Sequence, residues 1–306
     1  MIALAQVRIM TDSTCDLTLA EIAALDLRLV PVVINFEDGS YRELVDITIP
    51  EFYRKMAAQE ALPTTAQPAP GETLAAFTEL TAAGDEVISY HISGALSGSV
   101  NTAVSIAQRF PPGRVTVVDS RTTSIGLCCM VEAAARAAAA GCGRDEILSM
   151  TDYIRDNLLV YFVVDNLEAM RKGGRIGRAT AFLGGMLHIR PLLMVQDGVV
   201  SPVERIRGKS QSVRRMIEIV GGAKAAHDGP YWISAGHCDA AAELDEYMPE
   251  IAAGLGLRAE QIPKRAVGAA IGAHAGAGLL ALAYLPWPPF ILSMLARRGC
   301  VPPGLA

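Results

Sequence analysis

The first half of the chain repeats one unit three times: an apolar strand, a short turn rich in hydroxyl groups, and a helix. The expected strands lie at 7–10, 87–92 and 115–118, and a turn of small polar residues follows each of them directly. Strands that alternate with helices form parallel sheets covered on both faces, so this repeat predicts an α/β fold. Ligands of such sheets bind beyond the carboxyl ends of the strands, which is where all three turns fall.

The second half of the chain has a different pattern. Asp197-Gly198 lies between apolar runs at 189–195 and 199–206, and Asp-Gly favours the tight turn of an antiparallel hairpin. The apolar run 158–164 predicts a buried strand before this hairpin. The other expected elements are helices at 209–220 and 239–253, a strand at 230–235, and two buried strands around a glycine-rich turn within 266–285.

Together these patterns predict two α/β domains. Residues 1–160 are expected to form a Rossmann-like, three-layer α/β/α domain with a mainly parallel sheet. Residues 161–285 are expected to form a mixed α/β domain with antiparallel strands. Residues 286–306 are a C-terminal extension for which three roles stay open: covering a ligand site, packing between subunits, or lying loosely on the surface.

Composition narrows the classes of function. The 306 residues are 51% hydrophobic and carry a net charge of −5, so no broad attraction to nucleic acid or to an anionic membrane is expected. The six cysteines form no C-x-x-C pair and no metal-ligand cluster with the five histidines, so we expect neither a metal nor another cofactor. With no signal peptide or membrane-spanning segment predicted, we expect a cytoplasmic protein that is a monomer or a weak dimer.

Three familiar catalytic motifs are incomplete or missing. Gly208-Lys209-Ser210 resembles the end of a phosphate-binding loop, but Val203 occupies the position of its first glycine. No G-x-G-x-x-G follows the first strand, and no serine lies in a G-x-S-x-G turn. A nucleotide kinase, a dinucleotide-dependent enzyme and an α/β-hydrolase are therefore not expected.

Residues 165–178 form a cationic corner. A short helix is expected to end in Arg171 and Lys172, where positive charge suits the carbonyl end of the helix dipole. Gly173-Gly174 then stops the helix, because glycine adopts the left-handed cap conformation without strain. Arg175 follows directly, so the corner suits an anion or an acidic partner surface, with a solvated helix end as the alternative.

Hydroxyl groups and one histidine are the remaining candidate site residues. Thr65 precedes a helix expected near Pro70, and Ser97 lies at the start of another helix, close to Ser93. A hydroxyl at a helix N-terminus, next to free N–H groups, binds carboxylate or phosphate well, although a helix cap is the simpler explanation for any one of them alone. That explanation is weaker for Ser97, because Ser93, Gly94, Gly98 and Ser99 supply more polar and flexible positions than one cap needs. His274 is flanked by glycine and alanine, a context that lets its ring donate a hydrogen bond to an anion or serve a purely structural role.

Taken together, these segments resemble the DegV family of bacterial fatty-acid-binding proteins over about residues 7–285. Six segments carry the resemblance in the family's order: 11–17, 63–68 for its Thr-Ser-Gln-Pro turn, 93–99 for its Leu-Ser-Gly loop, 118–120, 167–176 and 271–274. The chain departs from the family pattern at several positions, where alanine or glycine replaces hydroxyl residues: Ala66, Ala69, Gly94 and Ala273.

The resemblance implies a function. One long-chain fatty acid would lie in an apolar tunnel between the two domains, with its carboxylate held by Thr65 and Ser97, by Ser93 beside them, and by the His274 segment. Some family members present the fatty acid to a separate ATP-dependent fatty-acid kinase. Arg175 and Arg207 resemble family positions implicated in that docking, which would place Arg175 at the rim, in contact with the partner or the emerging acyl phosphate.

Two alternatives stay open at this stage. The first is an enzyme that acts alone on a small phosphorylated or carboxylated substrate, with His274 as its acid–base group. The second is a fatty-acid carrier with no kinase partner. The preferred acyl-chain length, saturation and branching depend on the shape of the tunnel, which the sequence does not specify.

Overall fold

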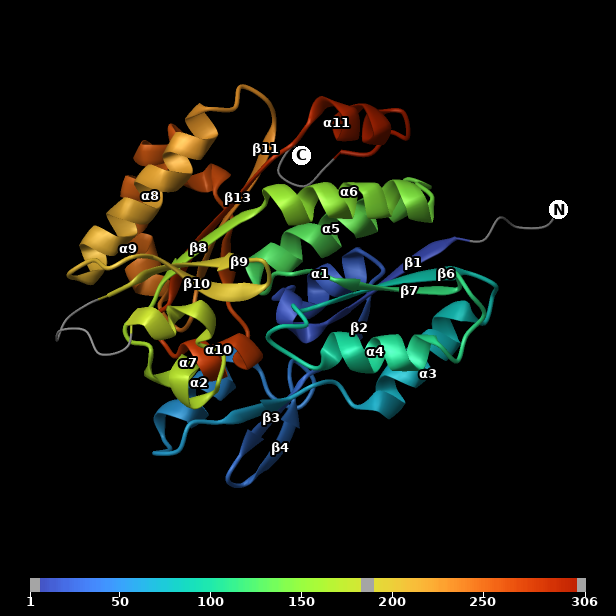
Figure 1. The fold of residues 1–306 in the computed structure, drawn as a ribbon, viewed down its shortest axis with the longest axis horizontal. Helices are drawn as coiled ribbons and strands as arrows, with labels where there is room; N and C mark the ends of the chain where they lie inside the picture. The colour runs from blue at the N-terminus through green and yellow to red at the C-terminus, as the bar shows by residue number, and fades with distance from the viewer. Residues whose placement is uncertain (1–5, 183–189, 302–306) are drawn as a thin grey trace.

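The computed structural model describes residues 6–182 and 190–301, which form two main sheets and one small sheet (Figure 1). The first sheet is entirely parallel, with the order β2 (Arg28–Val30), β1 (Val7–Asp12), β6 (Glu86–His91) and β7 (Val115–Asp119). These strands include the three predicted from the repeat, and their carboxyl ends lie at one edge of the sheet. The predicted parallel α/β architecture of the first half is confirmed.

The second sheet is mixed. Its order is β10 (Val199–Glu204), β9 (Leu192–Gln196), β8 (Leu159–Val163), β13 (Leu280–Pro286), β11 (Tyr231–His237) and β12 (Lys264–Ala266). Only β11 and β12 pair in parallel; all other neighbours are antiparallel. The hairpin of β9 and β10 turns at Asp197 and Gly198, which both have positive φ as the predicted turn requires. Ile189, at the start of the predicted run, lies outside the described residues.

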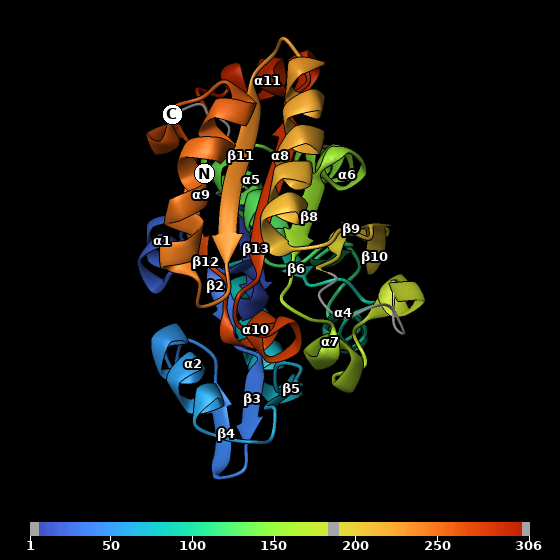
Figure 2. The same ribbon diagram turned by 90° about the vertical axis from the view of Figure 1, so that its left-hand side faces the viewer.

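Helices separate and cover the two sheets. Helices α3 (Pro70–Thr81) and α4 (Ser99–Ala107) lie on the outer face of the first sheet. Helix α5 (Ile125–Ala139) lies between the two sheets, with α6 (Arg144–Asn157) packed beside it (Figure 1). Helices α8 (Lys209–Ala225) and α9 (Ala241–Leu255) cover the outer face of the second sheet, the side that faces the viewer in Figure 2.

The composition of α5 fits its central position. Of its 15 residues, 11 are buried, and the alanines among them let the helix approach both sheets closely. A helix that is apolar on all sides is buried on all sides, in contrast to the surface helix α1 (Leu19–Ala24). The start of α1 has the capping box predicted from its sequence: Glu21 N donates to Thr18 Oγ1 at 3.2 Å, and Thr18 N donates to Glu21 Oε2 at 2.8 Å.

A small antiparallel sheet lies below the other two (Figures 1 and 2). It consists of β4 (Gly39–Arg42), β3 (Val33–Phe36) and β5 (Thr64–Ala66), and α2 (Ile49–Ala57) lies between β4 and β5 in the chain. The repeat of the first half did not predict this sheet. Its strands are only three or four residues long, and β3 pairs with a segment about thirty residues away, so local sequence carries a weak signal for them.

The prediction of two strands around a glycine-rich turn within 266–285 was correct for the second strand, β13, and wrong for the first. Strand β12 already ends at Ala266, and helix α10 (Ala269–Ala275) occupies the place of the first expected strand. Alanine is the strongest helix former, and a short apolar run with no polar face gives no period that separates helix from strand. Gly276 and Gly278, with φ of +78° and +86°, turn the chain after α10. His274 therefore lies on a helix.

The C-terminal segment packs on its own chain as far as the structure describes it. Trp287 is fully buried, and α11 (Pro289–Ala296) lies over α6, where the rings of Tyr153 and Phe290 meet edge to face with centroids 5.8 Å apart. Arg298 donates to the carbonyl of Gly141 at 2.7 Å and to Glu146 at 3.1 Å. As far as the structure describes it, up to Val301, the segment therefore packs onto the core of its own chain. Within the described ranges, no helix combines the length and the apolarity that crossing a bilayer demands.

Candidate functional site

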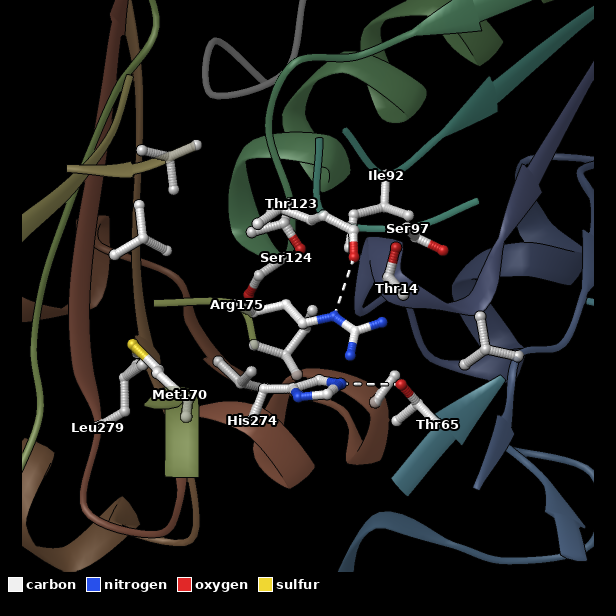
Figure 3. A pocket seen from close by; sticks show the side chains of 18 of the residues that line it. Thr14, Thr65, Ile92, Ser97, Thr123, Ser124, Met170, Arg175, His274 and Leu279 are labelled. Atoms are coloured by element: carbon white, nitrogen blue, oxygen red, sulfur yellow. Dashed lines mark hydrogen bonds between the residues drawn. The ribbon is translucent and has the colours of Figure 1, made fainter. Parts of the chain in front are cut away.

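A cavity of about 230 Å³ lies where the three sheets meet. Most of its walls are apolar side chains from the second sheet, from helices and from connecting segments: Val32, Ile92, Ile125, Val160, Phe162, Met170, Val195, Val200, Ile271 and Leu279. Figure 3 shows Met170 and Leu279 at one side of the cavity, away from the polar side chains. The cavity therefore has an apolar part and a polar part.

Three of the predicted head-group residues meet in the polar part. Thr65 lies on β5, Ser97 in the turn after β6, and His274 on α10, and all three line the cavity (Figure 3). The hydroxyl of Thr65 is 2.8 Å from His274 Nε2. The Ser97 hydroxyl lies 2.9 Å from the hydroxyl of Ser99, at the start of α4. Thr65 and His274, 209 positions apart, thus form a hydrogen-bonded pair, and Ser97 lines the same cavity.

The imidazole of His274 is neutral at pH 7. Burial, aided by the nearby positive charge of Arg175, lowers the pKa of His274 to about 4. Its Nδ1 is buried and has no hydrogen-bond partner among the described residues. The ring is carried on helix α10 rather than on a loop, and from there it reaches Thr65.

Arg175 places a positive charge within the cavity. Its Nε donates to the carbonyl of Leu96 at 3.2 Å, and its Nη1 donates to the carbonyl of Gly173 at 2.5 Å. None of the acidic side chains in the described ranges forms an ion pair with it. In Figure 3 the guanidinium lies in the space between Ser97 and His274. Arg175 thus lines the cavity rather than only its rim, and its charge is free to attract an anion.

Two other predicted residues lie elsewhere. The buried Ser93 hydroxyl accepts a hydrogen bond from Ala95 N at 3.2 Å, which shapes the turn after β6, and Ser93 is not among the lining residues. Arg207 is exposed in the connection between β10 and α8 and also lies outside the lining. The structure thus separates these two from the Thr65–Ser97–His274 set.

Further hydroxyl residues line the cavity without having been assigned from the sequence. Thr14, Thr123 and Ser124 come from the turns after β1 and β7. In the sequence, their position directly after predicted parallel strands was the feature that could have identified them as site residues. Thr14 donates to Asp12 Oδ1 at 2.5 Å and Ser124 donates to Asp16, so both hydroxyls already serve the internal structure.

Two buried carboxyl groups hold the start of α10. Gly268 N donates to Asp16 Oδ1 at 2.9 Å, and Ala270 N donates to Glu43 Oε1 at 2.9 Å. Ser13 donates to the second oxygen of Glu43 at 2.6 Å. Burial raises the pKa of Asp16 to about 7 and that of Glu43 to about 8. These contacts tie the helix that carries His274 to the first half of the chain.

The fold and the cavity define an α/β protein with an interior apolar cavity that ends in hydroxyls, a neutral histidine and one arginine. A family model described as "Uncharacterised protein, DegV family" matches residues 6–287. The chain belongs to the DegV family.

Relatives and solved structures agree with this assignment. A DegV domain-containing protein from Deinococcus radiodurans is 35% identical over 287 residues, which cover 92% of this chain and 98% of the relative. A DegV family protein from Thermus thermophilus, described as fatty acid binding, has a TM-score of 0.85 and 32% identity over 92% of this chain and all of its own. DegV from Bacillus subtilis, described as a fatty acid binding protein, has a TM-score of 0.84 and 25% identity over 93% of this chain and all of its own.

Proposed function

We propose that this protein binds one long-chain fatty acid, with the acyl chain in the apolar part of the cavity and the carboxylate at Thr65, Ser97 and His274. The observation that carries the proposal is that these three residues and Arg175 line one cavity whose walls are mostly apolar. The proposal divides the chain into domains at 1–160 and 161–285, with the tunnel between them. The two structural relatives described as fatty acid binding support it.

The two parts of the ligand are matched to the two parts of the cavity. Burial of an acyl chain contributes about 0.8 kcal/mol for each CH₂ group. A carboxylate taken out of water is costly unless hydrogen bonds or a cation compensate it. The hydroxyls of Thr65 and Ser97 supply hydrogen bonds, and Arg175 supplies the charge. Ser93 contributes by shaping the turn that holds Ser97, rather than by contact.

The second part of the proposal is that the bound fatty acid is presented to a separate ATP-dependent fatty-acid kinase. Arg207 supports this role because it is exposed and lies outside the cavity, where it can contact a partner. Arg175, with no ion-pair partner among the described residues, can contact the acyl phosphate as it forms. This role places the protein in the cytoplasm, as a monomer or a weak dimer that binds its partner transiently.

The alternative of a stand-alone enzyme requires His274 to transfer protons. An acid–base catalyst works best when its pKa lies near the operating pH, whereas the pKa of His274 is lowered to about 4. A group with this pKa remains neutral at pH 7 and is a weak base. The chemistry of His274 therefore favours hydrogen bonding over proton transfer.

The first test measures the ligand directly. The protein is expressed, and native mass spectrometry and lipid extraction are used to identify any bound fatty acid. The variant Thr65→Ala/Ser97→Ala is expected to bind at least about tenfold more weakly, because the buried carboxylate loses two hydrogen bonds. A matched control, Thr78→Ala/Ser210→Ala, removes the same groups from the exposed surface and should bind normally.

Two results would count against the proposal in different ways. Recovery of no fatty acid, together with no binding when oleate or palmitate is added, would overturn the proposed function. Unchanged binding by Thr65→Ala/Ser97→Ala would leave the function standing but remove these two residues from the head-group site.

A further inference from the structure

The ring of His274 lies directly against Gly173. A Cβ atom at position 173 would lie 2.2 Å from His274 Nδ1 and 3.0 Å from Cε1, far inside the distance at which non-bonded carbon and nitrogen atoms make favourable contact. The φ of Gly173 is −75°, an ordinary helical value that any residue adopts. The backbone conformation would therefore allow any residue at position 173. The space that the His274 ring occupies is what requires glycine there.

The neighbouring Gly174 provides the contrast. Its φ is +71°, which side chains rarely tolerate, yet nothing lies within 4 Å of a Cβ built on it. The two glycines after α7 (Glu168–Lys172) thus have separate physical roles. Gly174 allows the backbone to turn, whereas Gly173 leaves room for the imidazole.

The contact also determines which ring nitrogen carries the proton. Nδ1 packs against Gly173 and has no hydrogen-bond partner in the part of the chain that the structure describes. A proton on Nδ1 would be a buried donor without an acceptor, which is costly. A bare Nδ1 leaves only an acceptor unpaired, which buried groups tolerate better than an unpaired N–H, and places no hydrogen atom in the close contact with Gly173. The proton therefore lies on Nε2, 2.8 Å from Thr65 Oγ1.

This tautomer fixes the direction of the hydrogen bonds. The Nε2–H group of His274 donates to Thr65, so the single proton of the Thr65 hydroxyl points to another acceptor. The Thr65 hydroxyl thus offers its one proton to a ligand and keeps one lone pair. An ionised carboxylate accepts that proton and brings no donor, whereas a primary amide also brings two N–H donors, more than the single remaining lone pair of Thr65 can accept.

We infer that Gly173 is a positioning residue of the head-group site: it holds His274 with Nε2–H on Thr65 and thereby makes Thr65 a donor selective for an ionised carboxylate. The identity of the ligand rests on the proposed function. The tautomer and the role of Gly173 do not, because they follow from contacts within the protein.

The test combines a spectroscopic readout with binding. Protein labelled with ¹⁵N-histidine reports the tautomer of His274 through its ring ¹⁵N chemical shifts, assigned with His274→Ala. We expect the Nε2–H form in the unaltered protein and its loss in Gly173→Ala, with oleate bound about tenfold more weakly or worse. The control Gly174→Ala should lower Tm through backbone strain but keep the tautomer and the affinity. The unaltered protein should bind oleate at least about tenfold more tightly than oleamide.

A double-mutant cycle separates the ring from other effects of a methyl group at 173. In a His274→Ala background the ring is absent, so Gly173→Ala should weaken binding no further. The other close atom, the Ala169 carbonyl oxygen at 3.1 Å, is present in both backgrounds and cancels. If Gly173→Ala alone fails to fold, Gly173→Ala/His274→Ala should regain folding because the space is restored.

Three results would overturn the inference: an Nδ1–H tautomer in the unaltered protein, equal losses of affinity on adding Gly173→Ala in both backgrounds, or a double variant that remains unfolded while His274→Ala folds. A protein with no affinity for any fatty acid would refute the proposed function instead. In that case the tautomer, read without ligand, still decides the role of Gly173.

Discussion

At the scale of single residues, His274 connects the chemistry of the cavity to pH. Its ring is neutral because burial and the charge of Arg175 both oppose protonation. With a neutral ring beside it, Arg175 is the cation that would face the carboxylate of the proposed ligand. Protonating His274 would place a second positive charge in the cavity. That charge would be buried away from water, which is unfavourable.

The lowered pKa of His274 should make the free energy of unfolding depend on pH. The pKa of His274 falls from an ordinary 6.5 to about 4 in the folded protein, so the unfolded chain binds the proton more readily between these values. The contribution of His274 to stability is therefore lost as pH falls from about 6.5 towards 4, by up to about 3 kcal/mol.

Urea unfolding at pH 7 and at pH 4.5 measures the effect. His274→Gln, which cannot gain a charge, should lose less unfolding free energy between the two pH values than the unaltered protein. His227→Gln, at a histidine that does not line the cavity, serves as the matched control and should behave like the unaltered protein. An identical loss in His274→Gln and the unaltered protein would contradict the lowered pKa.

At the scale of elements, α10 shows how a short helix is positioned by groups from distant parts of the chain. Its first amides bind Asp16 and Glu43, and the hydroxyl of Tyr53 on α2 donates to the carbonyl of Val267 at 3.2 Å. A helix of seven residues has little stability of its own. These contacts, and the packing of α10 against α2 and β5, hold it in place.

Glu43→Gln tests the buried carboxyl. Burial raises the pKa of Glu43 from 4.5 to about 8, so the folded protein retains the proton where the unfolded chain has lost it. The stability that Glu43 contributes is present at low pH and is lost as pH rises through about 8. Relative to Glu43→Gln, the unaltered protein should therefore become less stable between pH 5 and pH 9.

Thermal melts at pH 5, 7 and 9 follow this difference, with Glu37→Gln as an exposed control that should show no such trend. A constant difference in Tm between the unaltered protein and Glu43→Gln across this range would show that Glu43 is already ionised in the folded state.

The elements that were predicted from the sequence are those with strong local signals. The strands with adjacent hydroxyl turns, the Asp197-Gly198 hairpin and the Thr18–Glu21 capping box each depend on residues within a few positions of one another. Helix α10 and the sheet of β3, β4 and β5 depend on tertiary contacts instead. The same is true of Arg175, whose place in the cavity depends on the carbonyl of Leu96, 79 positions away.

At the scale of the whole molecule, the cavity belongs to no single sheet. Its lining comes from the turns that follow strands of the first sheet, from the small sheet and from the second sheet, and the apolar core is continuous between them around α5. The exposed Arg207 lies outside this interior. The proposed binding of a fatty acid and the proposed contact with a partner can therefore be separated by mutation.

The variant Arg207→Ala tests contact with the partner without changing the cavity. We expect its affinity for oleate to equal that of the unaltered protein, because the residue does not line the cavity. With ATP and a purified fatty-acid kinase, formation of the acyl phosphate should fall about tenfold, since loss of a charged contact commonly costs 1–3 kcal/mol.

Arg214→Ala, at an exposed arginine paired with Glu250, is the control and should leave both measurements unchanged. Equal rates of acyl-phosphate formation for Arg207→Ala and the unaltered protein would exclude Arg207 from the docking surface. No acyl phosphate with any variant would favour a carrier that has no kinase partner.

The order of the strands along the chain has a consequence for synthesis. The central strand β13 and the helix α10 come from residues 269–286, whereas β5 and β8, which they contact, are made much earlier. Chains fold from the N-terminus as they emerge from the ribosome, so the parallel sheet can form while the second sheet still lacks its middle. The cavity is completed only once residues 269–286 have been made. A ligand that needs the whole cavity can bind only after that point, and a chain stalled before residue 269 would expose apolar surface for chaperones to recognise.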